Sequence, residues 1–250
     1  MTVQKSVNLT KDPSGRPAVD LTKVRETAPE LAKLADKAGI VLSQQDLSGV
    51  RAQVVVILDH SGSMRADYES GAVAKIINRA LGFALQVDVD GTVPVIPFDG
   101  RVWPVIDVTM TNFSTVVNDA LFRPQNMGST NLTDALVQLK EIASNTDDPI
   151  FAIIVTDGNP DNKTSTTRLV CELAGYPVFI KFLALRPVDY LSELDDLGDD
   201  KRLLDNVDAK PEKGTSLNLL TCTDAEFIEA MLDEWSSWIT VATAAGVLKA

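Results

Sequence analysis

Positive charge, cysteine and histidine are all scarce in this chain, and each shortage excludes a class of function. The net charge of −12 argues against binding nucleic acid through its phosphates, which requires basic patches, and against docking on anionic membranes. The two cysteines, Cys171 and Cys222, lie far apart and form no CxxC motif. We therefore expect two reduced, largely buried thiols rather than a disulfide.

Long apolar segments are also missing. The first residues lack the apolar core of a secretory leader. No apolar stretch approaches the ~18 residues that a membrane span requires. We expect a cytoplasmic protein that does not associate with membranes.

The common catalytic motifs are absent as well. The chain has no P-loop, no Gly-x-Gly-x-x-Gly fingerprint and no Gly-x-Ser-x-Gly elbow. The single histidine, His60, adjoins Asp59, and strand alternation points the two side chains apart, so the geometry of a catalytic triad is not expected. We therefore expect a protein that is not an enzyme. A metal-dependent hydrolase that uses the acidic residues described below is the alternative.

What the sequence does have is a regular alternation of apolar runs and amphipathic helical patterns. The runs predict strands at 52–58, 92–98, 102–106, 150–156, 178–185, and a sixth at either 203–207 or 216–220. The patterns between them predict helices at 67–87, 113–121, 132–143, 161–174, 190–197, and from 224 onward. This order is typical of an α/β protein with a doubly wound, mostly parallel six-stranded sheet. The Asp99-Gly100 turn makes strand 102–106 the antiparallel edge strand.

Three parts of the chain are distinguished. Residues 1–48 are predicted to be an N-terminal extension, in which 7–9 and 18–21 pair as a hairpin. A helix over 22–38 follows, kinked or restarted at Pro29 and capped by Gly39. We expect the extension to pack on the domain, with a free arm as the alternative. Residues 49–240 form the α/β domain and 241–250 a C-terminal tail.

An acid and two hydroxyls follow the first buried strand. Asp59, Ser61 and Ser63 come directly after the apolar run 54–58. In open α/β sheets, ligands bind at the carboxyl ends of the strands. Carboxylate and hydroxyl oxygens are hard ligands that suit Mg²⁺, Mn²⁺ or Ca²⁺. The Asp-x-Ser-x-Ser spacing allows the three side chains to converge on one centre.

Two later segments reach the same edge of the predicted sheet. Thr130 lies in a Gly-Ser-Thr loop that precedes a helix, and Asp157 follows the apolar run 150–155. The topology brings both loops beside the end of the first strand. The sequence therefore predicts one divalent-cation site made by Asp59, Ser61, Ser63, Thr130 and Asp157. Mg²⁺ is the expected ion, with Ca²⁺ and Mn²⁺ as alternatives.

This order of strand, Asp-x-Ser-x-Ser, loop threonine and strand-Asp-Gly resembles the von Willebrand factor A domain. The resemblance covers about residues 50–240. It implies that the five residues build a metal-ion-dependent adhesion site, in which the two serines coordinate the ion directly. It also implies a non-catalytic role, because the ion keeps an open position for an acidic group of a partner. The expected partner is a protein with an exposed Asp or Glu, and the chain is expected to be a monomer or a component of a larger complex.

A narrower resemblance concerns the whole chain. The leader Val7-Asn8-Leu9-Thr10-Lys11 and the segment from Val54 to Met64 resemble cytoplasmic A-domain proteins encoded with bacterial tellurium-resistance and stress-response systems. The resemblance implies a role in those systems. A structural A domain whose site is empty is the remaining alternative.

Other polar and aromatic residues have simpler interpretations. Asp161 is expected to cap the next helix, and Asp99 to serve its hairpin turn. The acidic run 195–200 lacks the spacing of an EF-hand and is interpreted as a solvated face. Trp235 and Trp238 are expected in the core or at a partner-docking face.

Overall fold

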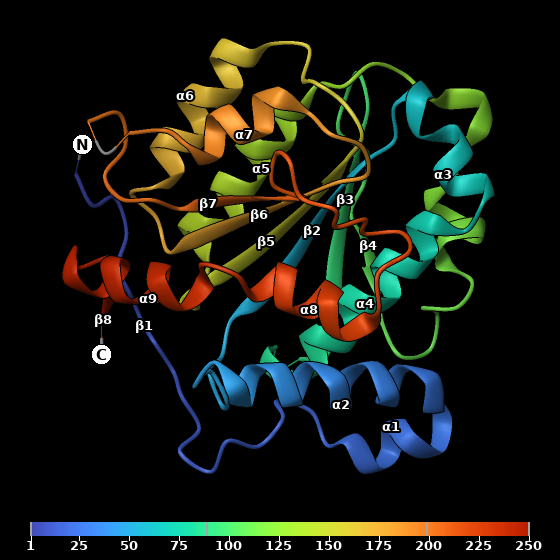
Figure 1. Ribbon diagram of the computed structural model, residues 1–250, viewed down its shortest axis with the longest axis vertical. Coiled ribbons are helices and arrows are strands. Elements are labelled where there is room, and N and C mark those ends of the chain that lie inside the picture. Colours follow the sequence, from blue (N-terminus) through green and yellow to red (C-terminus); the bar gives the residue numbers. More distant parts are fainter. Residues whose placement is uncertain (1, 89, 199, 250) are drawn as a thin grey trace.

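A six-stranded sheet forms the centre of the computed structural model, which describes residues 2–88, 90–198 and 200–249 (Figure 1). The strand order is β4-β3-β2-β5-β6-β7, and every pair is parallel except β3–β4. The strands are β2 (Gln53–Asp59), β3 (Val93–Phe98), β4 (Ile106–Val108), β5 (Ile150–Thr156), β6 (Val178–Ala184) and β7 (Val207–Lys210). The predicted sheet with one antiparallel edge strand is confirmed. Its central strands, β2 and β5, are covered on both faces.

Helices cover both faces of the sheet. One face packs α4 (Ala72–Val87), α8 (Asp224–Leu232) and α9 (Trp235–Ala244); the other packs α5 (Leu132–Asn145), α6 (Lys163–Leu173) and α7 (Asp189–Asp195). Strand alternation divides β2 between two cores: Val54 and Val56 belong to the first, Val55 and Ile57 to the second. Trp235 and Trp238 are buried in the first core. No helix of the described residues is long and apolar enough to cross a membrane.

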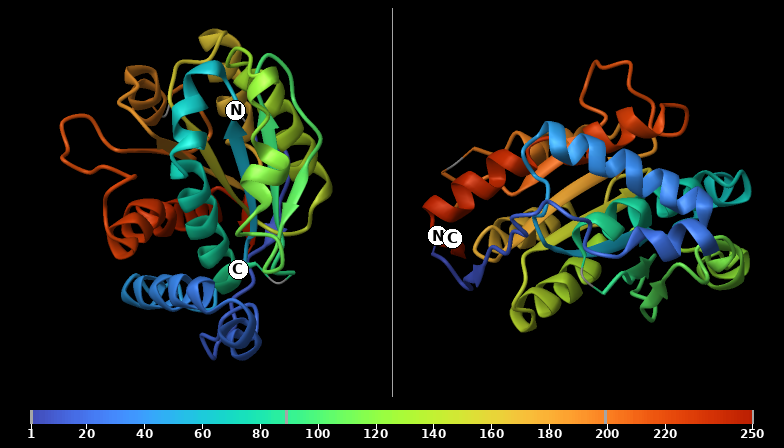
Figure 2. Two further views of the ribbon diagram at one scale, coloured as in Figure 1. Left: turned by 90° about the vertical axis from the view of Figure 1, so that its right-hand side faces the viewer. Right: turned by 90° about the horizontal axis from the view of Figure 1, so that it is seen from below.

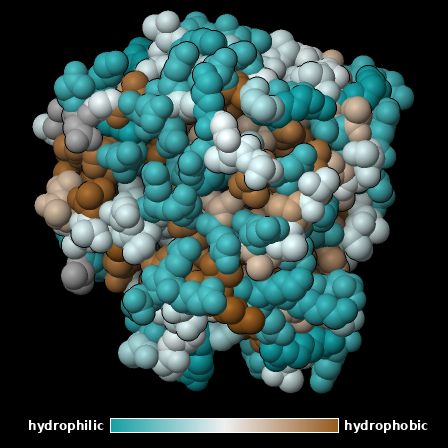
Figure 3. Space-filling view, in the orientation of Figure 1, coloured by the Kyte–Doolittle hydropathy of each residue, from teal (hydrophilic) through white to brown (hydrophobic). Residues whose placement is uncertain are grey.

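Hydrophilic residues cover most of the face in Figure 3, and apolar ones interrupt it only in scattered groups. The buried apolar side chains are those of the two cores. Both faces of the sheet are therefore covered, and the Asp59–Ser63 turn lies at the end of its strand β2.

Two strands differ from the prediction. The edge strand is β4 at 106–108 rather than 102–106, and only Val102 makes an isolated bridge, to Phe98. Pro104 has no amide hydrogen and cannot continue the ladder toward the turn. The sixth strand is β7, which the predicted segment 203–207 meets only at Val207. Its buried residues include Asp208 and Lys210, so an apolar pattern could not identify it.

Two predicted helices are divided. The helix predicted at 67–87 is split into α3 (Arg65–Glu69) and α4, separated by Gly71 at φ 80°. The helix predicted at 22–38 becomes α1 (Leu21–Thr27) and α2 (Pro29–Gln44), because Pro29 restarts the helix after Ala28. Gly39 does not cap it, and α2 continues to Gln44. Over 113–121 only a π-helical turn, Val117–Leu121, forms.

The predicted hairpin in the extension does not form. Instead β1 (Val7–Asn8) pairs in parallel with β8 (Leu248–Lys249), so the segment predicted as a tail contains a paired strand. The backbone amides of Ala18 and Val19 donate to the carbonyl oxygens of Gln86 and Leu85 at the end of α4. The two halves of the expected hairpin thus bind different parts of the domain.

The helix α2 packs on the domain across α4 and α8 (Figures 1 and 2). Gly82 of α4 lies directly against α2: a methyl group there would lie 2.6 Å from Cβ of Leu34. Nearby, Gln86 Nε2 donates to the carbonyl oxygen of Ala35 at 2.6 Å, and Lys37 Nζ lies 2.6 Å from the carboxylate of Asp224. A small residue in α4 therefore lets α2 lie directly against the domain.

Charged side chains of β6 and β7 are buried at the β7 end of the sheet. Lys181 and Asp208 are both 0% exposed and form an ion pair, and Lys210 Nζ lies 3.2 Å from Asp208 Oδ1. Lys181 Nζ also donates to the carbonyl oxygens of Ala230 and Asp233, each at 2.9 Å. These contacts supply partners for charges that would otherwise be costly to bury.

Two further acids border this ion network. Carboxylate oxygens of Asp195, Asp208 and Glu234 lie within 4.8 Å of one another, close enough to suggest a cation site. The ammonium groups of Lys181 and Lys210 already neutralise Asp208, so we assign a buried ion network and not a metal site. The solvated-face interpretation of 195–200 is therefore wrong for Asp195, which is partly buried; Asp199 lies outside the described residues.

We expect the substitution Gly82→Ala to destabilise the protein by about 1–2 kcal/mol, although alanine favours a helix by about 1 kcal/mol over glycine. The added methyl group would overlap Leu34 and force α2 away from α4. Gly39→Ala in the same interface should cost less, because its methyl group would meet the end of the Gln86 side chain, at 2.9 Å, rather than a Cβ attached to a helix backbone. Urea unfolding of both variants measures the difference. Equal stability of the two variants would show that the helices do not pack as described.

Asp195 generates a pH-dependent prediction. Burial, and then the charge of Glu234, raises the pKa of its carboxyl to about 7 from 3.8. Because the folded-state pKa is the higher one, the proton stabilises the folded chain, and this stabilisation is lost as the pH rises through about 7. Asp195→Asn should therefore exceed wild type in stability by about 1–2 kcal/mol at about pH 8, after allowance for partial exposure.

The advantage of Asp195→Asn should grow between about pH 4 and about pH 7 and level off above that range. Its exposed neighbour provides the comparison: Asp196→Asn removes only one of the weaker charges that raise the pKa of Asp195, so it should change the pH profile of unfolding much less. Denaturant titrations across this range give both profiles. A constant difference at every pH would contradict the assigned burial of Asp195.

Candidate metal centre

Asp59 ends β2 and is completely buried, at 0% exposure. One carboxylate oxygen accepts a hydrogen bond from the backbone N–H of Ser61 at 2.7 Å, and the other from the hydroxyl of Thr156 at 2.6 Å. Burial raises the pKa of this carboxyl to about 6, against the lowering effect of these hydrogen bonds. Asp59 thus joins the turn after β2 to the end of β5.

Ser61, Ser63 and Asp157 form a continuous row of oxygens next to Asp59. The hydroxyl oxygens of Ser61 and Ser63 lie 3.1 Å apart, and Ser63 Oγ donates to Asp157 Oδ1 at 2.8 Å. The turn Gly62–Met64 brings the two serines to the same side. Ser63 is exposed to solvent, whereas Ser61 is buried, so the row opens outward. The structure therefore brings together four of the five predicted site residues.

Thr130, the fifth residue, lies on the adjacent loop. Gly62 N donates to the carbonyl oxygen of Gly128 at 2.9 Å, so this loop runs beside the Asp59–Ser63 turn. A side chain at Gly128 would lie 3.2 Å from the carboxyl carbon of Asp99, which explains the glycine there. Backbone contacts thus place the Thr130 loop at the site.

Asp161 has a different role from the predicted helix cap. Its carboxylate accepts from Thr130 N at 3.1 Å, and its own N–H donates to the Thr130 carbonyl oxygen at 2.9 Å. The side chain that caps α6 is that of Asn162, which accepts from Ser165 N. Asp161 therefore fastens the Thr130 loop to the loop after β5.

Arg186, which follows β6, is a site residue that the sequence pattern did not indicate. Its guanidinium donates to Asp157 Oδ2 at 2.6 Å and to Asp67 Oδ2 at 2.9 Å. Both carboxylates are nearly buried, while the Arg186 side chain is 46% exposed. The arginine neutralises the acid at the end of the oxygen row. No local motif marks it, because its contacts lie 29 and 119 residues away in the sequence.

His60 faces away from the oxygen row. Its Nε2 accepts from the backbone N–H of Arg123 at 3.0 Å, which leaves the proton on Nδ1, 3.5 Å from Asp99 Oδ2. Burial lowers the pKa of the imidazole. Both ring nitrogens are thus engaged in fixing the loops around the site.

The oxygens of the row are hard donors that suit a divalent cation. Their separations of 3.1 Å and 2.8 Å are those of the hydrogen bonds that join them, and an entering ion would replace these bonds. Both oxygens of Asp59 already accept hydrogen bonds, which suits it to hold a water ligand of the ion. The donor set fits a hard divalent cation such as Mg²⁺, Mn²⁺ or Ca²⁺.

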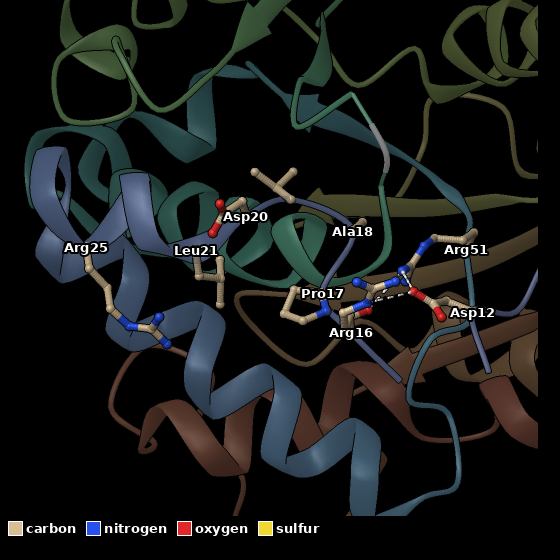
Figure 4. A pocket seen from close by; sticks show the side chains of 9 residues that line it. Asp12, Arg16, Pro17, Ala18, Asp20, Leu21, Arg25 and Arg51 are labelled. Carbon is tan, nitrogen blue, oxygen red and sulfur yellow. Dashed lines mark hydrogen bonds and ion pairs between the residues drawn. The ribbon is translucent and has the colours of Figure 1, made fainter. Parts of the chain in front are cut away.

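A hollow away from the candidate metal centre lies where the extension meets the domain (Figure 4). Its volume is about 630 Å³, and Arg51 lies on its wall. The Arg51 guanidinium donates to the carbonyl oxygens of Gln86 and Arg16, at 3.1 and 2.8 Å. These bonds fasten the extension to the domain, so we interpret the hollow as a seam rather than a ligand site.

Comparison with known proteins places this geometry in a family. The model of the vWA domain found in the TerF C terminus matches residues 51–248. The uncharacterized protein YcbR of Bacillus subtilis (strain 168) is 26% identical over 218 residues, which are 84% of this chain and 86% of YcbR.

Solved structures show more distant likenesses. Manganese-loaded TRAP protein of Plasmodium vivax is 12% identical, covers 73% of this chain and 72% of its own, and has a TM-score of 0.49. Proximal thread matrix protein 1 from the mussel byssus, with a zinc-occupied MIDAS motif, is 16% identical, covers 73% of this chain and 47% of its own, and has a TM-score of 0.46. These values are too low to transfer a site, and the assignment depends on the family model. Because that model spans most of the chain, the protein belongs to the von Willebrand factor A domain family, in its TerF-like group.

Proposed function

We propose that this protein is a metal-dependent interaction module. Asp59, Ser61, Ser63, Thr130 and Asp157 would hold a divalent cation, Mg²⁺ or Mn²⁺, and the ion would capture a carboxylate of a protein partner. The observation that carries the proposal is the convergence of Ser61, Ser63 and Asp157 into one row of hard oxygen donors beside the buried Asp59.

The charges of the site favour an external carboxylate. Ser61 and Ser63 are neutral ligands, so they orient an ion without cancelling its charge. The guanidinium of Arg186 shares the negative charge of Asp157. Asp59 is buried behind the serines, while Ser63 faces solvent. A bound divalent cation supplies an undercompensated positive charge at this exposed position, and an acidic side chain of a partner is its natural complement.

The wider role follows from the family. The TerF name supports a part in tellurium resistance or a related stress response. We propose that the protein acts there in the cytoplasm. A partner that presents an Asp or Glu there would bind only while the metal is present. The chain would then act as a monomer or as one component of a larger complex.

A hydrolase that uses a histidine as general base at this site is disfavoured by the position of His60. The single histidine is bound at both ring nitrogens and faces away from the oxygen row. It cannot serve there as a general base without breaking these contacts. We therefore assign binding rather than catalysis to the site.

The metal proposal predicts that Mg²⁺ and Mn²⁺ bind with one ion per chain and raise the unfolding temperature. At a hundredfold excess over the dissociation constant, the ion should stabilise the fold by about 2.7 kcal/mol. Ser63→Ala should weaken binding at least about tenfold by removing a direct ligand. Ser237→Ala, an exposed serine on α9, serves as the matched control. Calorimetric titration and thermal unfolding measure both effects, and a Ser63→Ala variant that binds like wild type would contradict the assignment.

Arg186 generates a second prediction. Its positive charge beside Asp157 opposes an incoming cation, so Arg186→Gln should tighten Mn²⁺ binding by about three- to tenfold at low salt. The gain should shrink at about 0.5 M salt, since the arginine is half exposed. Arg168→Gln removes the same charge from an arginine on α6 that pairs with Glu172 and should leave the affinity unchanged. Weaker Mn²⁺ binding in Arg186→Gln would mean that the arginine supports the ligand geometry instead of opposing the ion.

A further inference from the structure

Arginines gather beside the metal centre of a protein that is acidic overall. The chain carries 35 acidic and 23 basic residues. Arg65 directly follows the serine turn, Arg101 follows the Asp99-Gly100 turn, and Arg123 donates its backbone N–H to His60. Three arginines therefore lie near the site, and two of them, Arg101 and Arg123, lie on the side of β3 and β4.

Two of these arginines stack on the indole ring of Trp103. The guanidinium carbon of Arg101 lies 4.0 Å from the ring centroid of Trp103, and that of Arg123 lies 5.0 Å from it. Trp103 is partly exposed, and its Nε1 donates to Asp99 Oδ2 at 2.9 Å. Cation–π stacking and this hydrogen bond hold the three side chains in one arrangement. We call Arg101, Trp103 and Arg123 the arginine platform.

The platform is fastened to the metal loops. The carbonyl oxygen of Asp99 accepts from Asn131 N at 2.8 Å, next to Thr130. A side chain at Gly100 would lie 3.2 Å from Ser129 Oγ. The turn that supports Trp103 is therefore in contact with the loop that carries a predicted metal ligand. A partner seated at the metal centre would lie next to the platform.

The two stacked arginines differ from the other arginines in their pairing. Arg16, Arg25, Arg51, Arg65, Arg79, Arg168, Arg186 and Arg202 each have an ion pair with a carboxylate. In the described part of the chain, Arg101 and Arg123 have none. Arg101 is exposed, and the Arg123 Nε donates only to the carbonyl oxygen of Ala120. Their charges are available to a partner.

We propose that the arginine platform recognises additional carboxylates of an acidic partner segment whose first carboxylate binds the metal ion. This inference rests on the proposed function and narrows its partner from one acidic side chain to a segment with several. Guanidinium groups bind carboxylates through paired hydrogen bonds, and stacking on Trp103 fixes their planes in advance. Less side-chain freedom is then lost on binding.

A pair of labelled peptides tests the platform. One carries four Glu-Gly repeats and the other four Gln-Gly repeats, and fluorescence anisotropy measures their binding to the full chain in Mg²⁺ and in EDTA. Wild type should prefer the glutamate peptide in Mg²⁺. Arg101→Glu should weaken that binding by about tenfold or more, because the rim then repels the peptide, and added salt should reduce the difference.

Arg16→Glu is the matched control. It makes the same charge change at an arginine whose side chain is 78% exposed and which lies at the opposite edge of the sheet. This variant should bind the glutamate peptide like wild type. Arg123→Gln should weaken binding to a smaller extent. The emission of Trp103 should change when the glutamate peptide binds, since the other two tryptophans are buried, and Trp103→Phe should abolish that signal.

The outcomes separate this inference from the proposed function. Mg²⁺-dependent peptide binding that is equal in wild type and Arg101→Glu would overturn the platform and leave the metal module intact. Equal binding of the two peptides, or no binding of the glutamate peptide to wild type, would also overturn it. Loss of binding in Arg101→Glu, together with no metal binding by calorimetry in wild type, would support the platform while the proposed metal function fails.

Discussion

The geometry of the candidate metal centre depends on one buried carboxylate, that of Asp59. It accepts one hydrogen bond from the turn that follows β2 and one from Thr156 at the end of β5. These two hydrogen bonds join the carboxyl ends of β2 and β5, which are neighbours in the sheet. The serines follow β2, and Asp157 follows β5. The position of Asp59 is rigid because β2 is central in the sheet and is paired along both edges.

Burial of this acid has an energetic consequence. Its folded-state pKa of about 6 lies above the ordinary 3.8, so a proton stabilises the folded chain and that stabilisation is lost as the pH rises through about 6. At neutral pH the charged form costs at most about 3 kcal/mol. A cation in front of the serines would offset this cost, while Arg186 already offsets the charge of Asp157. With a cation bound, the site would hold negative charge inside and present positive charge outside.

The sequence predicted those features that depend on local spacing. Asp59, Ser61 and Ser63 follow one strand, and Asp157 follows its neighbour, so topology alone brings them to one edge. Features that depend on distant contacts were missed. Arg186 has no motif, β7 is concealed by its buried Asp208 and Lys210, and the pairing of β1 with β8 joins residues at opposite ends of the chain. Asp161 was misassigned because its neighbour, Asn162, is an equally good cap.

The extension and the metal centre lie at opposite edges of the sheet, and this separation has a physical reason. Lys5 donates to the carbonyl oxygen of Ser144, Gln4 N to that of Gly175, and Arg51 N to that of Thr10, all near the amino ends of strands. Helix α2 adds its apolar face against α4 and α8. The extension therefore stabilises the domain by contacts at the amino-terminal edge of the sheet and on the face that carries α4 and α8. None of these contacts covers the exposed Ser63 or the arginine platform. A partner that bound at the carboxyl edge would therefore not have to displace the extension.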